Sequence, residues 1–362
     1  MGEVRLMKGN EAIAEAMIRA GVDAYFGYPI TPQSEVIEYL TAEKPWERTG
    51  MVVLQAESEL AAINMVYGAA SCGKKVITTS SSPGISLMQE GISYIAGSEV
   101  PAVIVNVVRG GPGLGTIQPS QADYFQATKG GGHGDYHLIV LAPASVQEMA
   151  DFVPLAFDLA FKYLNPVMIL SDGVIGQMME KVELFDPIPR WTNEEIEQMH
   201  GDWALVGYKP GKNKRHVITS LDLVPETQEQ FVLKLKKKYE EIEKNEVRYE
   251  TFNTEDAEYL IVAYGSSSRI SQKTMQLARE QGIKLGLLRP ITLYPFPYEP
   301  IRKLVPQLKG VLTVEMSLGQ MVEDVKLATE CKVPVEHYGR LGGMIPSPEE
   351  ILDVLKTKII GG

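Results

Sequence analysis

The chain has very little cysteine: Cys72 and Cys331 are the only two among 362 residues, and they lie far apart in the sequence. Two cysteines exclude a disulfide framework in a chain of this length. They are also too few for an iron–sulfur cluster, which takes four thiolate ligands. If this protein takes part in electron transfer, its clusters are expected on another subunit.

Long apolar runs and an excess of positive charge are also missing. No run of about 20 apolar residues is present, so no transmembrane helix and no membrane partner are expected. The first residues lack the charged-then-apolar order of a signal peptide, which predicts a cytoplasmic protein. The net charge of −11 argues against nucleic acid as a partner, because binding to it depends on neutralising phosphates. An anionic substrate would need a local cation, for which Arg109 is a candidate.

What the chain does have, through residue 185, is an alternation of strand-like and helix-like segments. The run at 102–108 is almost continuously apolar and β-branched, as in a parallel strand covered on both faces. Other apolar runs lie at 22–26, 51–54, 75–79, 138–141 and 167–170, separated by helix-like stretches at 34–40, 59–70, 86–96 and 145–162. This alternation predicts a doubly wound α/β fold with a parallel sheet.

The length predicts two domains at about 150 residues each, with room for an insert. The apolar periodicity weakens at residue 186, and residues 186–255 are predicted to form a charged linker or insert with a helix at 228–244. A second α/β unit is predicted for residues 256–362, with strands at 259–264, 285–288, 311–314 and 335–338. We therefore expect domains at 1–185 and 256–362.

Three motifs stand where predicted strands end. Residues 27–32 place the Thr31 hydroxyl between two prolines, residues 55–59 offer the carboxylates of Glu57 and Glu59, and residues 107–113 offer the guanidinium of Arg109. In an open α/β sheet, the carboxyl ends of the strands form the ligand crevice. A carboxylate and an arginine there suit a site that handles a nitrogen heterocycle and an anionic substrate.

Each motif also has a purely structural explanation. Glu57 and Glu59 would interact well with the dipole of the helix that follows. Arg109 could cap a strand at the surface, and the proline-bounded turn could be purely structural, with Thr31 or Ser34 capping the next helix. The hydroxyl-rich segment 78–84 could line the same crevice or form a turn. The residues alone leave these alternatives open.

Two other motifs are weak. The glycine-rich stretch 110–115 does not complete a dinucleotide fingerprint, because Thr116 occupies its last glycine position and Pro112 interrupts the turn. His133 and His137 have the spacing of two metal ligands on a helix, but the surrounding glycines predict a loop. No metal site is expected in this chain.

The intact motif Tyr28-Pro29-Ile30-Thr31-Pro32, taken with Glu59 and Arg109, resembles the alpha-type, pyrimidine-side subunit of the thiamine-diphosphate-dependent 2-oxoacid:ferredoxin oxidoreductases. The resemblance spans nearly the whole chain. It implies a pyrimidine-type thiamine-diphosphate-binding domain, a linker and a smaller transketolase C-terminal-like domain.

The resemblance also implies roles for individual residues. Glu59 would bind N1′ of the aminopyrimidine and favour the imino tautomer that removes the C2 proton. Tyr28 and Pro29 would adjoin the cofactor. Thr31 and Arg109 would bind the 2-oxoacid, because the planar fork of an arginine matches a carboxylate.

The same resemblance implies a multi-subunit complex. A partner subunit would hold the diphosphate and its magnesium, and partner subunits, including a ferredoxin-like gamma subunit, would carry iron–sulfur clusters. The complex would decarboxylate the 2-oxoacid, transfer the acyl group to coenzyme A and pass electrons to ferredoxin.

The segment 110–116 looks most like the branched-chain type, which uses 2-oxoisovalerate, although 2-oxoglutarate and pyruvate stay open as substrates. Two functions of other classes also stay open. A stand-alone nucleotide- or coenzyme-A-binding α/β enzyme would be active as the isolated chain. A non-catalytic scaffold would leave the assembled complex active when Glu59 is replaced by glutamine.

Overall fold

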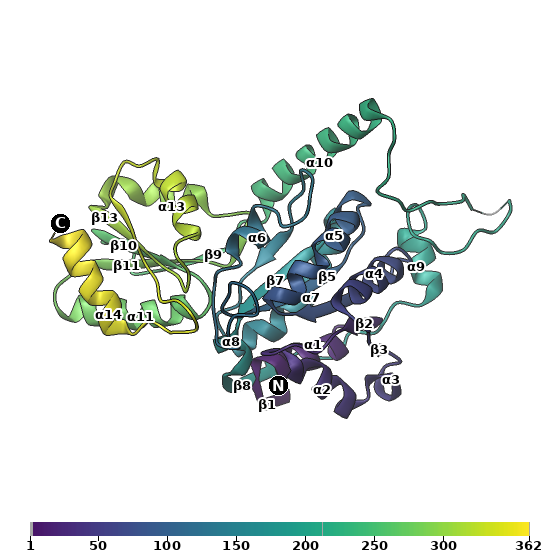
Figure 1. Ribbon diagram of the computed structural model, residues 1–362, viewed down its shortest axis with the longest axis horizontal. Coiled ribbons are helices and arrows are strands. Elements are labelled where there is room, and N and C mark those ends of the chain that lie inside the picture. Colours follow the sequence, from purple (N-terminus) through teal and green to yellow (C-terminus); the bar gives the residue numbers. More distant parts are fainter. Residues whose placement is uncertain (1–2, 212, 362) are drawn as a thin grey trace.

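The computed structural model describes residues 3–211 and 213–361 and shows two lobes (Figure 1). The larger lobe is built on a seven-stranded sheet and the smaller lobe on a five-stranded one. The larger sheet has the order β12 (Thr292–Tyr294), β6 (Ile139–Leu141), β7 (Val167–Asp172), β5 (Val103–Val108), β4 (Val76–Ser80), β2 (Ala24–Gly27) and β3 (Val52–Gln55).

All neighbouring strands of the larger sheet are parallel, except for β12 at one edge. Strands β5 and β7 are buried along their whole length, as expected for strands with helices on both faces. Helix α1 (Gly9–Arg19) packs against α7 (Val146–Tyr163), and α4 (Glu59–Ala70) packs against α5 (Ser82–Gly97). The predicted doubly wound fold is confirmed.

The smaller lobe has its own core. Parallel strands β14 (Val335–Tyr338), β13 (Gly310–Val314), β10 (Tyr259–Ala263) and β11 (Leu285–Pro290) lie side by side, and β9 (Tyr249–Phe252) joins antiparallel at the edge. Helices α11 (Gly265–Glu280), α12 (Tyr298–Leu304), α13 (Met321–Thr329) and α14 (Pro348–Val354) accompany these strands. Ile261, Leu287 and Leu312 pack with Ile351 in its centre.

Two strands cross the divisions predicted from the sequence. Strand β9 lies within residues 186–255 but pairs with the smaller sheet, and β12 lies within residues 256–362 but pairs with the larger sheet. Strands β1 (Glu3–Lys8) and β8 (Met179–Leu184), which the sequence patterns do not indicate, form a separate antiparallel pair. The boundaries 1–185, 186–255 and 256–362 remain a proposal for the domains. They describe the order of segments along the chain, since one strand on each side of residue 255 pairs with the other domain's sheet.

The segment between the lobes contains α9 (Asn193–His200) and the charged helix α10 (Pro225–Asn245). Figure 1 shows α10 along the upper side of the larger lobe, leading back to the smaller one. It buries Leu235, Tyr239 and Ile242 and exposes most of its charged residues. Within the described ranges, no helix has the length and apolarity needed to cross a membrane.

Gln121 ties the two lobes together from a buried position. Its Nε2 donates to the carbonyl oxygen of Tyr264 (3.0 Å), while its Oε1 accepts from the Ser267 hydroxyl (2.6 Å) and the Met316 amide (3.0 Å). Its backbone N–H donates to the Met316 carbonyl (2.9 Å). A buried amide whose groups are all paired fixes the relative position of the elements it joins.

Gln121→Leu is expected to destabilise the protein, because it leaves the polar groups that bind Gln121 without hydrogen-bond partners in the interface between the lobes. We expect the free energy of unfolding to fall by roughly 2–4 kcal/mol, since an unsatisfied buried polar group costs about 1–3 kcal/mol. Urea unfolding measures the change. Gln118→Leu, on an exposed stretch of the adjoining loop, is the control and should change stability by less than about 0.5 kcal/mol. Equal losses in both variants would contradict this role for Gln121.

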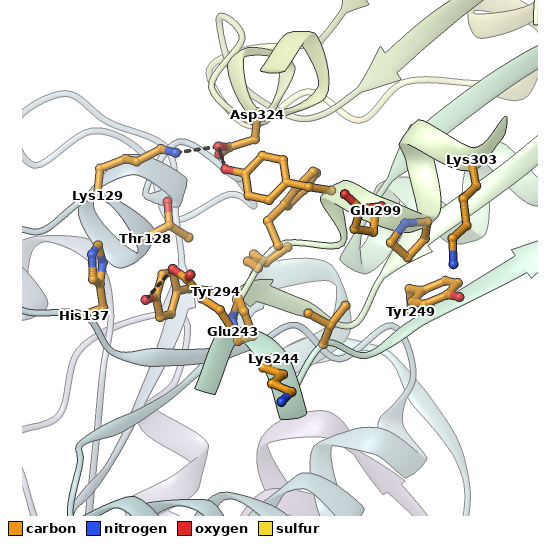
Figure 2. A pocket seen from close by; sticks show the side chains of 16 residues that line it. Thr128, Lys129, His137, Glu243, Lys244, Tyr249, Tyr294, Glu299, Lys303 and Asp324 are labelled. Atoms are coloured by element: carbon orange, nitrogen blue, oxygen red, sulfur yellow. Dashed lines mark hydrogen bonds and ion pairs between the residues drawn. The ribbon is translucent and has the colours of Figure 1, made fainter. Parts of the chain in front are cut away.

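A cavity of about 620 Å³ also lies in the seam between the lobes (Figure 2). On its wall the buried Asp324 accepts hydrogen bonds from Lys129 Nζ (2.5 Å) and the Tyr298 hydroxyl. Tyr294 stacks on His137 with ring centres 4.3 Å apart. None of the site residues predicted from the sequence lines this cavity.

Candidate active site

Four neighbouring parallel strands of the larger sheet, in the order β5, β4, β2 and β3, have their carboxyl ends on the same side of the sheet. Arg109 follows β5, Ser80 ends β4, Thr31 lies on the loop after β2, and Glu59 follows β3 at the start of α4. The three predicted motifs therefore meet at the carboxyl ends of the strands, where open α/β sheets bind ligands.

Arg109 is buried, with 7% of its surface exposed, and it is held against the loop after β2. Its Nη1 donates to the carbonyl oxygen (2.9 Å) and the hydroxyl (3.3 Å) of Thr31, and its Nη2 donates to the carbonyl of Leu114 (3.1 Å). Its Nε is buried without a partner. A carboxylate that replaced the Leu114 carbonyl could take the Nε–Nη2 edge in bidentate fashion.

Glu59 is the first residue of α4, whose N-cap is Ser58. Its side chain is 6% exposed, and within the described residues no hydrogen bond reaches its carboxylate. The helix dipole stabilises a negative charge in this turn, but it does not satisfy the acceptor oxygens. Glu57 differs, because it is exposed and accepts the Ser58 hydroxyl at 3.1 Å.

The first turn of α5 connects Glu59 with Arg109. The Ser82 hydroxyl accepts from the Arg109 amide (3.1 Å) and donates to the Arg109 carbonyl (3.3 Å). Two residues on, a Cβ added to Gly84 would lie 2.6 Å from Glu59 Oε1 and 2.1 Å from Ser80 Oγ. Only glycine leaves this space beside the carboxylate open.

Ser80, the last residue of β4, lies beside Glu59 at the Gly84 position. The hydroxyls of Thr78, Ser80 and Ser81 are fully buried and have no hydrogen-bond partner. Thr79 instead binds within the core, where its Oγ1 donates to Gln33 Oε1 (2.6 Å). Sequence patterns did not single out Ser80, although its place at a strand end before a proline–glycine pair is a signal that could have done so.

Gln33 holds the loop that carries Tyr28, Pro29 and Thr31. It is fully buried, and its Nε2 donates to the carbonyl of Tyr28 (3.2 Å). Gln33 occupies the N-cap position of α2 (Ser34–Glu43), and no side chain caps this helix. The capping explanation for Thr31 is therefore wrong, and its hydroxyl contacts Arg109 instead.

These features fit the aminopyrimidine of thiamine diphosphate. Among the described residues, Glu59 offers a carboxylate that receives no hydrogen bond, Ser80 a buried hydroxyl without a partner, and Gly84 a space that a Cβ would fill. Tyr28 and Pro29 lie half-buried on the neighbouring loop. A flat heterocycle with a ring N–H could donate a hydrogen bond to the Glu59 carboxylate, which no described residue occupies.

A second cavity, of about 800 Å³, opens beside Thr31. Ile117, Met178 and Ile345 line it together with the carboxylates of Glu35 and Glu38. Among the described residues, neither a lysine nor an arginine lines it, although Lys8 pairs with Glu35 (3.3 Å). Burial raises the pKa of Glu35, but hydrogen bonds from Asn10 and Gln177 outweigh this and leave the pKa below its usual range. This wall is apolar and anionic.

The fold and the site define the class: a two-domain subunit with a pyrimidine-type cofactor domain. Residues 15–251 match the family model described as "Pyruvate flavodoxin/ferredoxin oxidoreductase, thiamine diP-bdg". Residues 257–351 match the one described as "Pyruvate:ferredoxin oxidoreductase core domain II". The chain belongs to the family of 2-oxoacid:ferredoxin oxidoreductases, as its sequence motifs indicated, and it is an oxidoreductase subunit.

Individual relatives agree with this assignment. The chain is 50% identical to the ketoisovalerate oxidoreductase subunit VorB of Methanothermobacter marburgensis, over 96% of each chain. It is 28% identical, at a TM-score of 0.84, to a 2-oxoglutarate:ferredoxin oxidoreductase of Magnetococcus marinus solved with 2-oxoglutarate, coenzyme A and succinyl-CoA, and covers 66% of that longer chain. A split-gene transketolase shares the fold at 12% identity and a TM-score of 0.60. The predicted transketolase-like architecture is confirmed.

Proposed function

We propose that this chain is the pyrimidine-side subunit of a 2-oxoisovalerate:ferredoxin oxidoreductase. The observation that carries the proposal is the position of Glu59, a largely buried residue whose carboxylate receives no hydrogen bond from the described residues and which lies at the same strand ends as Arg109 and Thr31. A scaffold without catalytic function gives no reason for placing this carboxylate together with an arginine and a hydroxyl at the carboxyl ends of the strands, where open α/β sheets bind ligands.

In this proposal Glu59 accepts a hydrogen bond from N1′ of the aminopyrimidine, and Tyr28 and Pro29 flank the ring. When bound, thiamine diphosphate supplies the nucleophilic carbon for the keto group and the electron sink for decarboxylation. Glu59 moves the proton at N1′ and so controls the basicity of the exocyclic nitrogen. Gly84 leaves the space that this contact requires.

Arg109 and Thr31 bind the carboxylate of the 2-oxoacid. Nη1 of Arg109 stays on Thr31, while Nε and Nη2 face the substrate once the Leu114 carbonyl has moved away. Burial of the guanidinium strengthens this contact, because fewer water molecules compete for it.

The remaining parts of the reaction belong to partners. With only two cysteines, this chain has too few thiolates for a cluster, so we place the iron–sulfur clusters on partner subunits. A thiamine-diphosphate-binding partner holds the diphosphate and magnesium. Coenzyme A accepts the acyl group, and ferredoxin accepts the electrons.

A branched-chain substrate is supported by the relative that shares 50% identity and by the cavity beside Thr31, whose described lining includes two glutamates and neither lysine nor arginine. Glu38 would repel a second substrate carboxylate, whereas the charge of Glu35 is partly offset by Lys8 (3.3 Å). The test is anaerobic affinity purification of the complex from its native cells, followed by viologen reduction with coenzyme A, thiamine diphosphate and each 2-oxoacid. We expect kcat/KM for 2-oxoisovalerate to exceed that for 2-oxoglutarate by at least about tenfold, since burying an unpaired carboxylate is costly.

Other outcomes would correct this proposal. A preference for 2-oxoglutarate or pyruvate would keep the reaction and overturn the substrate. An intact complex with iron-containing partners that oxidises no 2-oxoacid would favour the scaffold. A chain that elutes alone with a bound nucleotide would favour the stand-alone enzyme.

A further inference from the structure

The hydroxyl of Ser80 has no explanation in the packing of the sheet. Ser80 is fully buried at the end of β4, and its Oγ has no hydrogen-bond partner. Asn106 stands opposite it on β5, but the Asn106 Nδ2 donates to Asp123 (2.9 Å), and no bond joins it to Ser80. A buried hydroxyl without a partner lowers stability, so such groups in folded proteins usually have a function or a missing partner.

Glu59 offers an acceptor close to Ser80 that receives no hydrogen bond from the described residues. Ser80 Oγ and Glu59 Oε1 both lie within 2.6 Å of the point that a Cβ on Gly84 would occupy, so they face each other across the space that this glycine leaves. Within the described residues neither group makes a hydrogen bond, and the Oδ1 of Asn106 on the paired strand is a second buried acceptor without a partner. A small rotation of either side chain would bring the hydroxyl onto the carboxylate.

We propose that Ser80 is a positioning residue for Glu59. When the cofactor is in place, the Ser80 hydroxyl donates to the carboxylate and fixes the plane in which Glu59 meets N1′. Ser80 contacts neither the 2-oxoacid nor the diphosphate. This inference rests on the function proposed for Glu59 and adds a residue whose role neither the sequence motifs nor the comparisons assign.

The chain offers a matched control in Thr78. It lies two residues earlier on the same face of β4, is equally buried and also has a hydroxyl without a partner. Thr78 Oγ1 is not among the atoms nearest to the Gly84 space. Thr78→Val therefore removes a comparable hydroxyl without removing the contact with Glu59.

The experiment uses the assembled complex, purified anaerobically and loaded with thiamine diphosphate and magnesium, without 2-oxoacid. Exchange of the cofactor's C2 proton for deuterium is followed by acid quench and NMR, and the dissociation constant of thiamine diphosphate is measured separately. For Ser80→Ala we expect exchange to slow by roughly 10- to 100-fold, the effect of one hydrogen bond to a charged group. Thiamine diphosphate affinity should stay within about twofold, because the main cofactor contacts are unchanged.

Ser80→Cys keeps the volume with a weaker donor and should fall between wild type and Ser80→Ala. Thr78→Val should exchange at the wild-type rate. The inference is overturned if Ser80→Ala also exchanges at that rate, or if Ser80→Ala and Thr78→Val slow exchange equally, since either result leaves Ser80 with a packing role alone.

The same measurement on Glu59→Gln distinguishes the role proposed for Ser80 from the role proposed for Glu59. If it slows exchange and Ser80→Ala does not, only the role of Ser80 fails. If Glu59→Gln exchanges at the wild-type rate, the proposed function of Glu59 fails as well.

Discussion

Glu59→Gln is expected to lower the turnover of the assembled complex by roughly 100- to 10,000-fold, the range that a positioned general acid–base group contributes. Glutamine has nearly the same shape as glutamate but cannot carry the charge or shuttle the proton at N1′. Because the Glu59 carboxylate receives no hydrogen bond from any other described residue, this substitution breaks no hydrogen bond within the described part of the chain. Assembly and the unfolding transition should therefore stay as in wild type.

Glu57→Gln is the matched control for this experiment. Glu57 lies two residues earlier but is exposed and bound to Ser58. It should retain wild-type turnover. The measurement is viologen reduction by complexes of equal subunit composition, checked by size-exclusion chromatography. Full activity of Glu59→Gln in an intact complex would support the scaffold alternative.

Arg109→Ala is expected to raise the KM of the 2-oxoacid by at least about 100-fold, since it removes two charge-assisted hydrogen bonds worth about 1.5–3 kcal/mol each. The value of kcat should change much less, because the contact is made with a carboxylate already present in the ground state. Initial rates over a wide range of 2-oxoacid concentration separate the two parameters.

Arg109 also anchors the loop after β2 through Thr31 and the next loop through Leu114, so a control for loop position is needed. Arg109→Lys keeps a cation but not the planar fork and should recover only part of the affinity. Thr31→Val removes one hydroxyl contact and should raise KM by a smaller factor. A normal KM in Arg109→Ala would remove this residue from the substrate pocket.

The positions of Glu59, Arg109 and Thr31 could be predicted because parallel strands impose a simple rule. The apolar run of β5 predicts a strand buried on both faces. The residues that follow such a strand lie at the carboxyl ends of the parallel strands, where open α/β sheets bind ligands. The order of the strands was not needed, since any order brings their carboxyl ends to the same side.

Other parts of the structure could not be read from local patterns. Strand β12 has three residues and joins the larger sheet from beyond the linker, so its place is decided by tertiary packing rather than by its own periodicity. Edge strands β1, β8 and β9 also lack a continuous apolar run, because much of their surface is exposed.

Ser80 and Gly84 show the limit at the level of the site. From the sequence, residues 78–84 could equally line the crevice or form a capped turn. Only the structure shows that Ser80 and Glu59 both lie next to the Gly84 position. Helix α5 contacts Arg109 through Ser82 and Glu59 through Gly84. This double contact likewise depends on the three-dimensional arrangement of the strand ends.

The central claim is that this chain presents Glu59 to a cofactor held by another subunit. The most direct measurement is an electron cryomicroscopy structure of the anaerobically purified complex with thiamine diphosphate and 2-oxoisovalerate. The account predicts density for the aminopyrimidine between this chain and a partner, with a Glu59 carboxylate oxygen at hydrogen-bond distance from N1′ and the substrate carboxylate on Arg109. A cofactor bound elsewhere, with Glu59 facing only protein, would contradict it.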